Sequence, residues 1–481
     1  MSRSRATMAR LLAAALAALI LSPAHAWDGE LSLGVGATYS DNINLAPPGQ
    51  EESDLVLSVT PGLSVSREGG RIAFDFDYRG NGLLYAGDSE RNNVFHQMSA
   101  DANAELVPEL LFLDVDARYE QRLISSGTGT LGRDLVSSPS DFSNVLTYRF
   151  SPYVRPRLGS YANTELRYQY WVTEYAGDSD QSSQTDEIRL RIDSGEAFGR
   201  LGWSLRYGGT QVDYDDGTST EFEEYRGRLR VDPIEQLGIY AEAGHENDPS
   251  DSGNARSRRS GNLWQLGVIW TPTIRTRAEI FYADRYFGNY FGWSLRHRFR
   301  SSTWAFDYQE EPSTAALTAP DVTGSGRLGL DEGPLLDEAG DPLVVDGDFP
   351  ATTTDSFLRR RATLAVQGQR VRIGWGARLF YEERNYASSQ QDETRMGAGL
   401  NLSYRIAPRT QVFGNLDWLR SDSEDEVDNE NSQLVRFGLQ HELGPYRSVS
   451  ADYRFVNSEG FEGGVESYRE NRVSVVFSAF F

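Results

Sequence analysis

Arginine recurs at every second position in two stretches near the middle of the sequence. One stretch carries Arg189 and Arg191, and the next carries Arg226, Arg228 and Arg230. Side chains two residues apart share a face of an extended strand, so each stretch predicts a row of guanidinium groups. Guanidinium groups bind carboxylates and phosphates through paired hydrogen bonds, so the predicted chemistry is contact with anionic groups. The full set of arginines that we predict to line one common polar face is Arg167, Arg189, Arg191, Arg206, Arg226, Arg228, Arg230, Arg372 and Arg378.

Carboxylates alternate in the same manner closer to the two ends of the chain. They are Asp75, Asp77, Asp114, Asp116, Asp417 and Asp452. If the arginine segments and the aspartate segments line opposite arcs of the same inner face, the electric field between the two arcs would orient hydrated or anionic solutes. If they face one another across strands, ion pairs would neutralise both. The sequence leaves these two alternatives open.

Residues suited to catalysis are scarce. After residue 26 the histidines are His96, His245, His297 and His441, which fall on segments far apart in sequence. The chain has no Cys, and it carries no G-x-S-x-G, H-E-x-x-H or phosphate-loop motif. We therefore expect a protein that is not an enzyme and that needs neither a cofactor nor a metal.

The first 26 residues predict export from the cytoplasm. A basic start is followed by an apolar run over residues 11–21 and by Ala24-His25-Ala26, the pattern of a signal peptide cleaved before Trp27. The formal net charge of -23 disfavours nucleic acid as a partner. Because no later stretch approaches the roughly 20 apolar residues of a membrane helix, any membrane span must consist of strands.

From residue 27 onward, apolar and polar residues alternate. Over residues 72–79, Ile72, Phe74 and Phe76 share one face, and residues 371–381 repeat the pattern. Segments of about ten residues with a single apolar face match the length and chemistry of tilted transmembrane strands. We count about 22 such segments, or about 18 if weak neighbours are merged.

The sequence therefore predicts an all-β fold, a transmembrane antiparallel up-and-down outer-membrane β-barrel of about 18–22 strands. Residues 27–481 form this single barrel, and the first strand begins near Glu30, so we expect no plug domain. Short turns alternate with longer loops, and the longest loop, residues 313–354, is the predicted extracellular gate. The acidic gate residues are Asp331, Glu332, Asp337, Glu338, Asp341, Asp346 and Asp348.

The last segment alternates apolar residues up to an aromatic end. Its apolar residues are Val473, Val475, Phe477, Ala479 and the terminal Phe481. The pattern resembles the signal read by the bacterial barrel-assembly machinery. We therefore expect that machinery, outer-membrane lipid and lipopolysaccharide as partners. The expected location is integral in the outer membrane of a Gram-negative bacterium.

The opening of the mature chain is more distinctive than the rest. Residues 36–46 read GATYSDNINLA, and they are followed by Ser53-Asp54 and by TPGLS over residues 60–64. This stretch resembles the start of the outer-membrane β-barrel family associated with PEP-CTERM/exosortase systems, which is encoded in exopolysaccharide loci. The resemblance covers essentially all of the mature chain. It implies a role in moving exopolysaccharide, or an associated product, across the outer membrane, and it supplies no catalytic or binding residues.

Several functions remain open at this stage. The preferred hypothesis is an outer-membrane pore or export conduit for exopolysaccharide that works with a periplasmic polysaccharide-export protein. Inward aromatic residues such as Trp171 and Phe281 would then stack on sugars. The alternatives are a general diffusion porin, a structural barrel that binds surface polymer or cations without transport, and an outer-membrane hydrolase.

Overall fold

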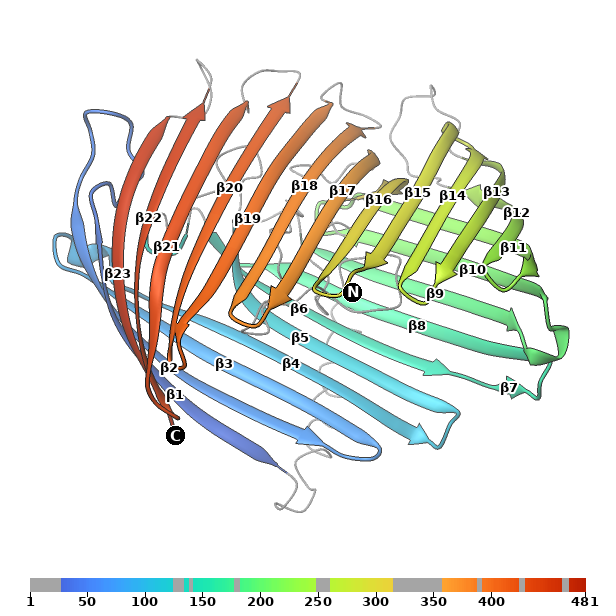
Figure 1. Ribbon diagram of the computed structural model, residues 1–481, viewed down its shortest axis with the longest axis horizontal. Coiled ribbons are helices and arrows are strands. Elements are labelled where there is room, and N and C mark those ends of the chain that lie inside the picture. The colour runs from blue at the N-terminus through green and yellow to red at the C-terminus, as the bar shows by residue number, and fades with distance from the viewer. Residues whose placement is uncertain are drawn as a thin grey trace.

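The computed structural model describes residues 27–123, 134–137, 142–176, 182–247, 260–314, 357–386, 392–423, 429–460 and 467–481. Within them the chain forms one antiparallel sheet of 23 strands, of which β7 is only two residues long. Successive long strands pair with one another, and β23 pairs with β1, so the 22 long strands close into a barrel. Figure 1 shows the strands following one another round the wall, with the red β23 beside the blue β1 and β2. The predicted barrel is confirmed, and the predicted signal peptide lies outside the described residues.

The long strands contain 10 to 16 residues, which suits tilted strands that cross a membrane. The first half of the barrel is β1 Asp28–Ser40, β2 Asp54–Glu68, β3 Ile72–Tyr85, β4 Asn93–Val107, β5 Leu111–Leu123, β6 Phe142–Val154, β7 Arg157–Leu158, β8 Ala162–Tyr175, β9 Ser183–Ser194, β10 Leu201–Tyr214, β11 Ser219–Ile234 and β12 Leu237–Asn247. The second half is β13 Ser260–Thr273, β14 Thr276–Arg285, β15 Gly288–Arg298, β16 Ser302–Ser313, β17 Phe357–Arg370, β18 Ile373–Tyr386, β19 Glu393–Ala407, β20 Thr410–Ser423, β21 Glu430–Gly444, β22 Arg447–Gly460 and β23 Tyr468–Phe480. Two single-turn 3-10 helices, η2 Ser89–Arg91 and η4 Glu196–Phe198, lie in connections.

The two faces of the barrel wall differ in chemistry. On β23 the apolar Val473 and Val475 are 49% and 47% exposed, whereas Glu470 and Arg472, on the other face of the strand, are buried. The same alternation exposes Leu33 on β1. An exposed apolar face fits a lipid surround, and the polar face lines the lumen. No helix among the described residues is long and apolar enough to cross a membrane.

The connections are short at one end of the barrel and more varied at the other. Two residues, 408–409, join β19 to β20 at the first end. At the second end, residues 41–53 join β1 to β2, although residues 286–287 suffice to join β14 to β15. The predicted asymmetry of turns and loops is therefore present but incomplete.

The predicted assembly signal lies on the strand that closes the barrel. Val473, Val475 and Phe477 face outward and are 39–49% exposed. The chain end continues the pairing of β23 with β1, because Phe481 exchanges two backbone hydrogen bonds with Leu31, with N–O distances of 2.8 and 3.2 Å. The seam between the first and last strands is thus hydrogen-bonded to the last residue.

The stretch that carries the family resemblance binds the first strand of the barrel to the last. Asp41, just beyond β1, accepts hydrogen bonds from the backbone and side-chain nitrogens of Asn471 on β23, both at 2.7 Å. The buried Asn42 donates to the carbonyl oxygens of Arg469 at 2.9 Å and of Ala46 at 2.8 Å. Its side-chain oxygen accepts from the backbone nitrogen of Ala46 at 2.9 Å, which closes the first turn of the loop. We call Asp41 and Asn42 together the seam clasp.

Candidate functional site in the charged lumen

Strand register brings the predicted arginines into one field on the inner wall. Arg167 on β8 lies opposite Arg189 on β9. Arg206 on β10 lies opposite both Arg191 on β9 and Arg226 on β11. Each pair consists of nearest neighbours across adjacent strands, and like charges in such positions repel unless anions separate them. The arginine field therefore depends on the carboxylates around it.

Carboxylates are interleaved with the field and pair with most of it. Glu242 on β12 is buried and accepts from the Arg228 Nε at 2.6 Å and from the Arg226 Nη1 at 3.4 Å. Among the described residues, Arg206 makes no ion pair. The other pairs of the field are Arg167 with Asp114 and Glu165, Arg189 with Glu187, Arg191 with Asp193, Arg226 with Glu224 and Glu246, and Arg230 with Asp232. These contacts favour the alternative in which inward charges neutralise one another.

The two remaining predicted arginines lie elsewhere. Arg378 is on the inner face of β18, where its guanidinium lies 5.7 Å from the ring centroid of Phe380. Arg372 is not on a strand at all, because β18 begins at Ile373 and residues 371–372 form the turn. Val371 adopts a φ of 50°, and its side chain is 88% exposed. The alternating pattern had extended the strand by two residues too many, so Arg372 is exposed at the end of the barrel.

Inward aromatic rings lie flat against glycines of the next strand. Tyr240 on β12 is opposite Gly267 on β13, and a Cβ on that glycine would lie 2.3 Å from the ring. The other side of the ring is covered by Arg228, whose guanidinium lies 4.1 Å from the centroid. Tyr240 is only 2% exposed, so this ring is not free to stack on a sugar. Phe281, which is predicted to stack on sugars, packs edge to face against Tyr290.

Replacing Gly267 by alanine is expected to lower the free energy of unfolding by about 1–3 kcal/mol, the usual cost of overpacking. The ring has nowhere to move, since the Tyr240 hydroxyl donates to Glu279 at 2.8 Å and accepts from Gln265 at 2.7 Å. Urea titration of the barrel in lipid vesicles measures the change. The matched control is Gly202→Ala, where a Cβ would lie 3.7 Å from its nearest neighbours. Equal stability of the two variants would contradict the packing argument.

The predicted acidic arc exists, but it adjoins the arginine field. Asp75, Asp101 and Asp116 lie side by side on β3, β4 and β5. Asp116 pairs with Arg149 on the next strand, β6, at 2.7 Å. The aspartates and the arginine field meet along the wall, because Asp114 on β5 pairs with Arg167 on β8 at 2.7 Å.

A second row of arginines, absent from the sequence prediction, crosses the wall near the seam. Arg436 on β21 lies opposite Arg454 on β22, and Arg454 lies opposite Arg472 on β23. Arg436 pairs within the wall, with Asp452 at 3.1 Å. The sequence contained a signal for this row. Arg436 and Arg454 are equally far in sequence from Pro445 in the turn between their strands, and residues so placed face one another in a hairpin.

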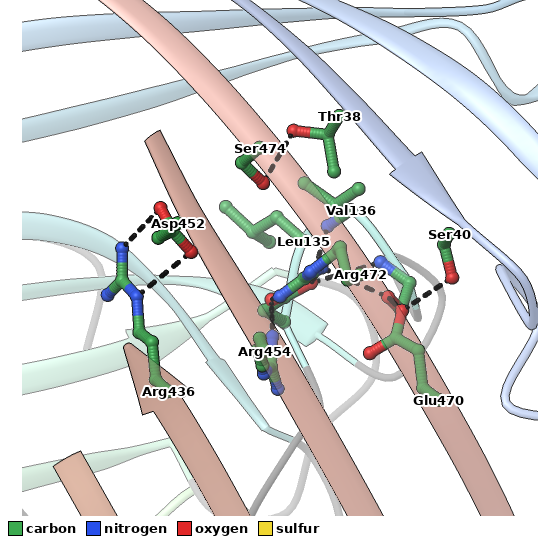
Figure 2. Close-up of polar contacts among 12 residues, drawn as sticks. Thr38, Ser40, Leu135, Val136, Arg436, Asp452, Arg454, Glu470, Arg472 and Ser474 are labelled. Atoms are coloured by element: carbon green, nitrogen blue, oxygen red, sulfur yellow. Dashed lines mark hydrogen bonds and ion pairs between the residues drawn. The ribbon is translucent and has the colours of Figure 1, made fainter. Parts of the chain in front are cut away.

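Four residues from the connection between β5 and β6 lie inside the lumen against this second row. We call residues 134–137 the lumen segment. The carboxylate of Asp134 contacts the guanidinium groups of both Arg454 and Arg472, and its Oδ1 accepts from the Arg472 Nη1 at 3.0 Å. Figure 2 shows Leu135 and Val136 beside these two arginines, with β1 on the other side.

Polar and apolar contacts anchor the lumen segment further. Ser137 donates to Glu470 on β23 at 2.6 Å, and the same oxygen of Glu470 accepts from Ser40 on β1 at 2.8 Å. The hydroxyl of Tyr85 donates to the carbonyl oxygen of Val136 at 2.8 Å. Leu135 and Val136 pack against a buried apolar cluster on the inner side, formed by Ile43, Val56, Leu83, Tyr85 and Phe95.

The lumen segment contacts the inner wall at a place that the sequence did not indicate. Its partners on β22 and β23 lie more than 300 positions away in sequence, and the loop has no periodic pattern. The predicted gate loop, with Asp331, Glu332, Asp337, Glu338, Asp341, Asp346 and Asp348, lies outside the described residues.

Comparisons with known proteins return structural similarity only. No protein-family model matches the chain, and no curated protein matches it. A mutant of the ferric enterobactin receptor PfeA from Pseudomonas aeruginosa is 8% identical with a TM-score of 0.48, over 94% of this chain and 80% of that one. The FrpB iron transporter from Neisseria meningitidis is 10% identical with a TM-score of 0.44, over 96% and 82%. OmpT, an outer membrane protein of Vibrio cholerae, is 7% identical with a TM-score of 0.35, over 95% and 97%.

The class of protein follows from the strand pairing and the two faces of the wall. A closed barrel of 22 long antiparallel strands, apolar outside and polar inside, is an outer-membrane type of β-barrel. This architecture fits a pore or transport role. Its distinguishing features are a charge-paired lumen and a loop segment held inside it.

Proposed function

We propose that this protein is an outer-membrane conduit for a hydrophilic polymer and that the polymer is an exopolysaccharide. The observation that carries the proposal is the charged inner wall of a closed barrel, on which arginines and carboxylates are interleaved across β8 to β12. Such a wall replaces the hydration of a polar cargo without binding it tightly, as conduction requires. The resemblance of residues 36–46 to exopolysaccharide-associated barrels supplies the cargo, and that step is one of association.

Export is tested by deleting the gene in its own host and measuring polymer in the medium and in the periplasm. We expect the polymer to disappear from the medium and to accumulate behind the outer membrane, with recovery on complementation. Complementation with Arg189→Ala/Arg191→Ala, whose side chains are 44% and 59% exposed to the lumen, is expected to restore less export of an anionic polymer. Normal secretion in the deletion strain would overturn the proposed function.

The charge pairing gives a second candidate function some support. Because most arginines of the field are matched by carboxylates, the wall offers little net selectivity, as in a general diffusion porin. A porin would pass neutral and charged small solutes at similar rates and would show no dependence on polymer synthesis. Uptake of small sugars by vesicles that contain the barrel separates the two functions.

A further inference from the structure

We propose that Arg454 and Arg472 form a carboxylate-binding site for the cargo, that Asp134 occupies this site in the resting barrel, and that a carboxylate-bearing polymer releases the lumen segment by displacing Asp134. The inference rests on the proposed function, since it names the chemical class of the polymer and the means by which the polymer opens its own path.

The first argument is the placement of the two guanidinium groups. Arg454 and Arg472 are nearest neighbours across β22 and β23, both on the inner face, and Arg472 also lies opposite the uncharged Ser40. Neighbouring strands lie about 4.8 Å apart, so cations on facing residues repel one another unless an anion lies between them. The site is therefore built for a carboxylate or a group like it, and planar guanidinium forks suit that geometry.

The second argument is the origin of the anion that fills the site. Asp134 belongs to a connection between strands and not to the barrel wall, so it can leave without breaking any strand pairing. Its neighbour in the row differs in this respect, because Arg436 is paired with Asp452 on the adjoining strand β22. Within this row, and among the described residues, the pair at Arg454 and Arg472 is satisfied by a group that is not part of the wall.

The third argument is the unfavourable charge next to the site. Glu470 is fully buried on β23, where Ser137 bridges it to Arg472 by hydrogen bonds of 2.6 and 3.1 Å. The second carboxylate oxygen of Glu470 has no hydrogen-bond partner among the described residues. A buried carboxylate in this position repels Asp134, so the resting contact is held less tightly than the two arginines alone would hold it. The site is thereby poised for exchange.

The displacement of Asp134 exchanges one carboxylate for another, so the fraction of barrels in which Asp134 is displaced depends on the concentration of polymer carboxylate. Asp134 belongs to the same chain as the two arginines, and tethered groups act at effective concentrations of about millimolar. A polymer carries many carboxylates, so when one leaves the site its neighbour on the same polymer replaces it. The polymer therefore competes with Asp134 at a chain concentration equal to or lower than the effective concentration of Asp134. A neutral polymer has no group that can replace Asp134.

The test follows the position of the lumen segment directly. The chain has no Cys, so a nitroxide attached to Leu135→Cys reports from one site in the refolded mature barrel. We expect an immobilised spectrum at rest, a mobile spectrum with oligogalacturonate at about millimolar carboxylate, and no change with neutral dextran of similar length. Asp134→Asn in the labelled protein should give the mobile spectrum without any polymer, whereas Arg436→Gln should keep the resting one. Heat-modifiable migration on gels confirms that each variant is folded.

The outcomes distinguish this inference from the proposed function. An immobile label in the presence of oligogalacturonate, in a barrel that still supports polymer export in cells, overturns the inference and leaves the conduit in place. If oligogalacturonate releases the label but the gene-deletion strain still secretes polymer normally, the carboxylate site is supported and the proposed conduit function is overturned. Equal release by dextran would show that the site does not recognise carboxylates. Single-channel current of the unlabelled protein with the same two polymers checks that the nitroxide itself does not free the segment.

Discussion

Replacing Asp134 by asparagine is expected to raise the single-channel conductance of the barrel, because the substitution removes the charge that holds the lumen segment against the wall. The asparagine oxygen can still accept from the backbone N–H groups of Val136 and Ser137, now at 3.0 Å, so the local turn is kept. The contacts with Arg454 and Arg472 lose their ionic character. Hydrogen bonds to charged groups contribute about 1.5–3 kcal/mol each, and a loss of about 3 kcal/mol shifts the held-to-released equilibrium roughly 100-fold.

Planar-bilayer recording of the refolded mature barrel measures this effect. The matched control is Asp452→Asn, which removes the same charge from the inner wall, where Asp452 pairs with Arg436. We expect the control to alter ion selectivity while leaving the size of the current steps near that of the unsubstituted protein. Equal rises in both variants would show that wall charge sets the conductance. No rise in Asp134→Asn would show that the lumen segment does not narrow the pore.

The fold was predictable because its main signal is local. Alternation of apolar and polar side chains depends only on strand geometry, so it placed Val473 outward and Arg228 inward before any pairing was known. Strand number followed in the same way, and the weak neighbours over residues 290–299 and 303–308 proved to be the separate strands β15 and β16. Strand ends are less secure, because a turn such as 371–372 can continue the alternation by chance, which misplaced Arg372.

The pairing inside the lumen was not predictable from alternation. Which carboxylate meets Arg228 depends on the register between β11 and β12, and that register sets Arg228 directly opposite Glu242. A shift of two residues would preserve the alternation and change the partner. The lumen segment was harder still to predict, since Asp134 and Arg472 lie 338 positions apart in sequence and belong to no common strand pair. Sequence reasoning thus gave the polar wall but not the contacts that decide what the wall can do.

The seam clasp gives a physical reason for the most distinctive stretch of the sequence. In the sequence alone, residues 36–46 indicate only a resemblance to a family. In the structure they end β1 and hold it to β23, where Asp41 and Asn42 bind Asn471 and the backbone of Arg469. The pairing of the first strand with the last has no covalent connection, so hydrogen bonds and the packing of Leu45 against Val456 and Tyr468 resist opening of the barrel at this line.

Replacing Asn42 by alanine is therefore expected to lower the free energy of unfolding by about 3 kcal/mol. Three hydrogen bonds are lost, one to Arg469 and two to Ala46, each contributing about 1 kcal/mol. The site is buried, so water cannot replace them fully, and the loss is expected to appear as easier opening of the seam. Urea titration in vesicles measures the stability, and the heat-modifiable gel band measures the folded fraction.

Asn44 supplies the matched control for the seam clasp, because it lies in the same loop but is exposed; it donates to Glu52 at 2.8 Å and accepts from Arg91. Asn44→Ala is expected to change the stability by no more than about 0.5 kcal/mol, as is usual for surface positions. If both variants lose stability equally, the loop as a whole, rather than the buried bonds of Asn42, holds the seam. If neither does, the backbone ladder between β1 and β23 is sufficient, and the distinctive residues at this position must serve a partner outside the barrel.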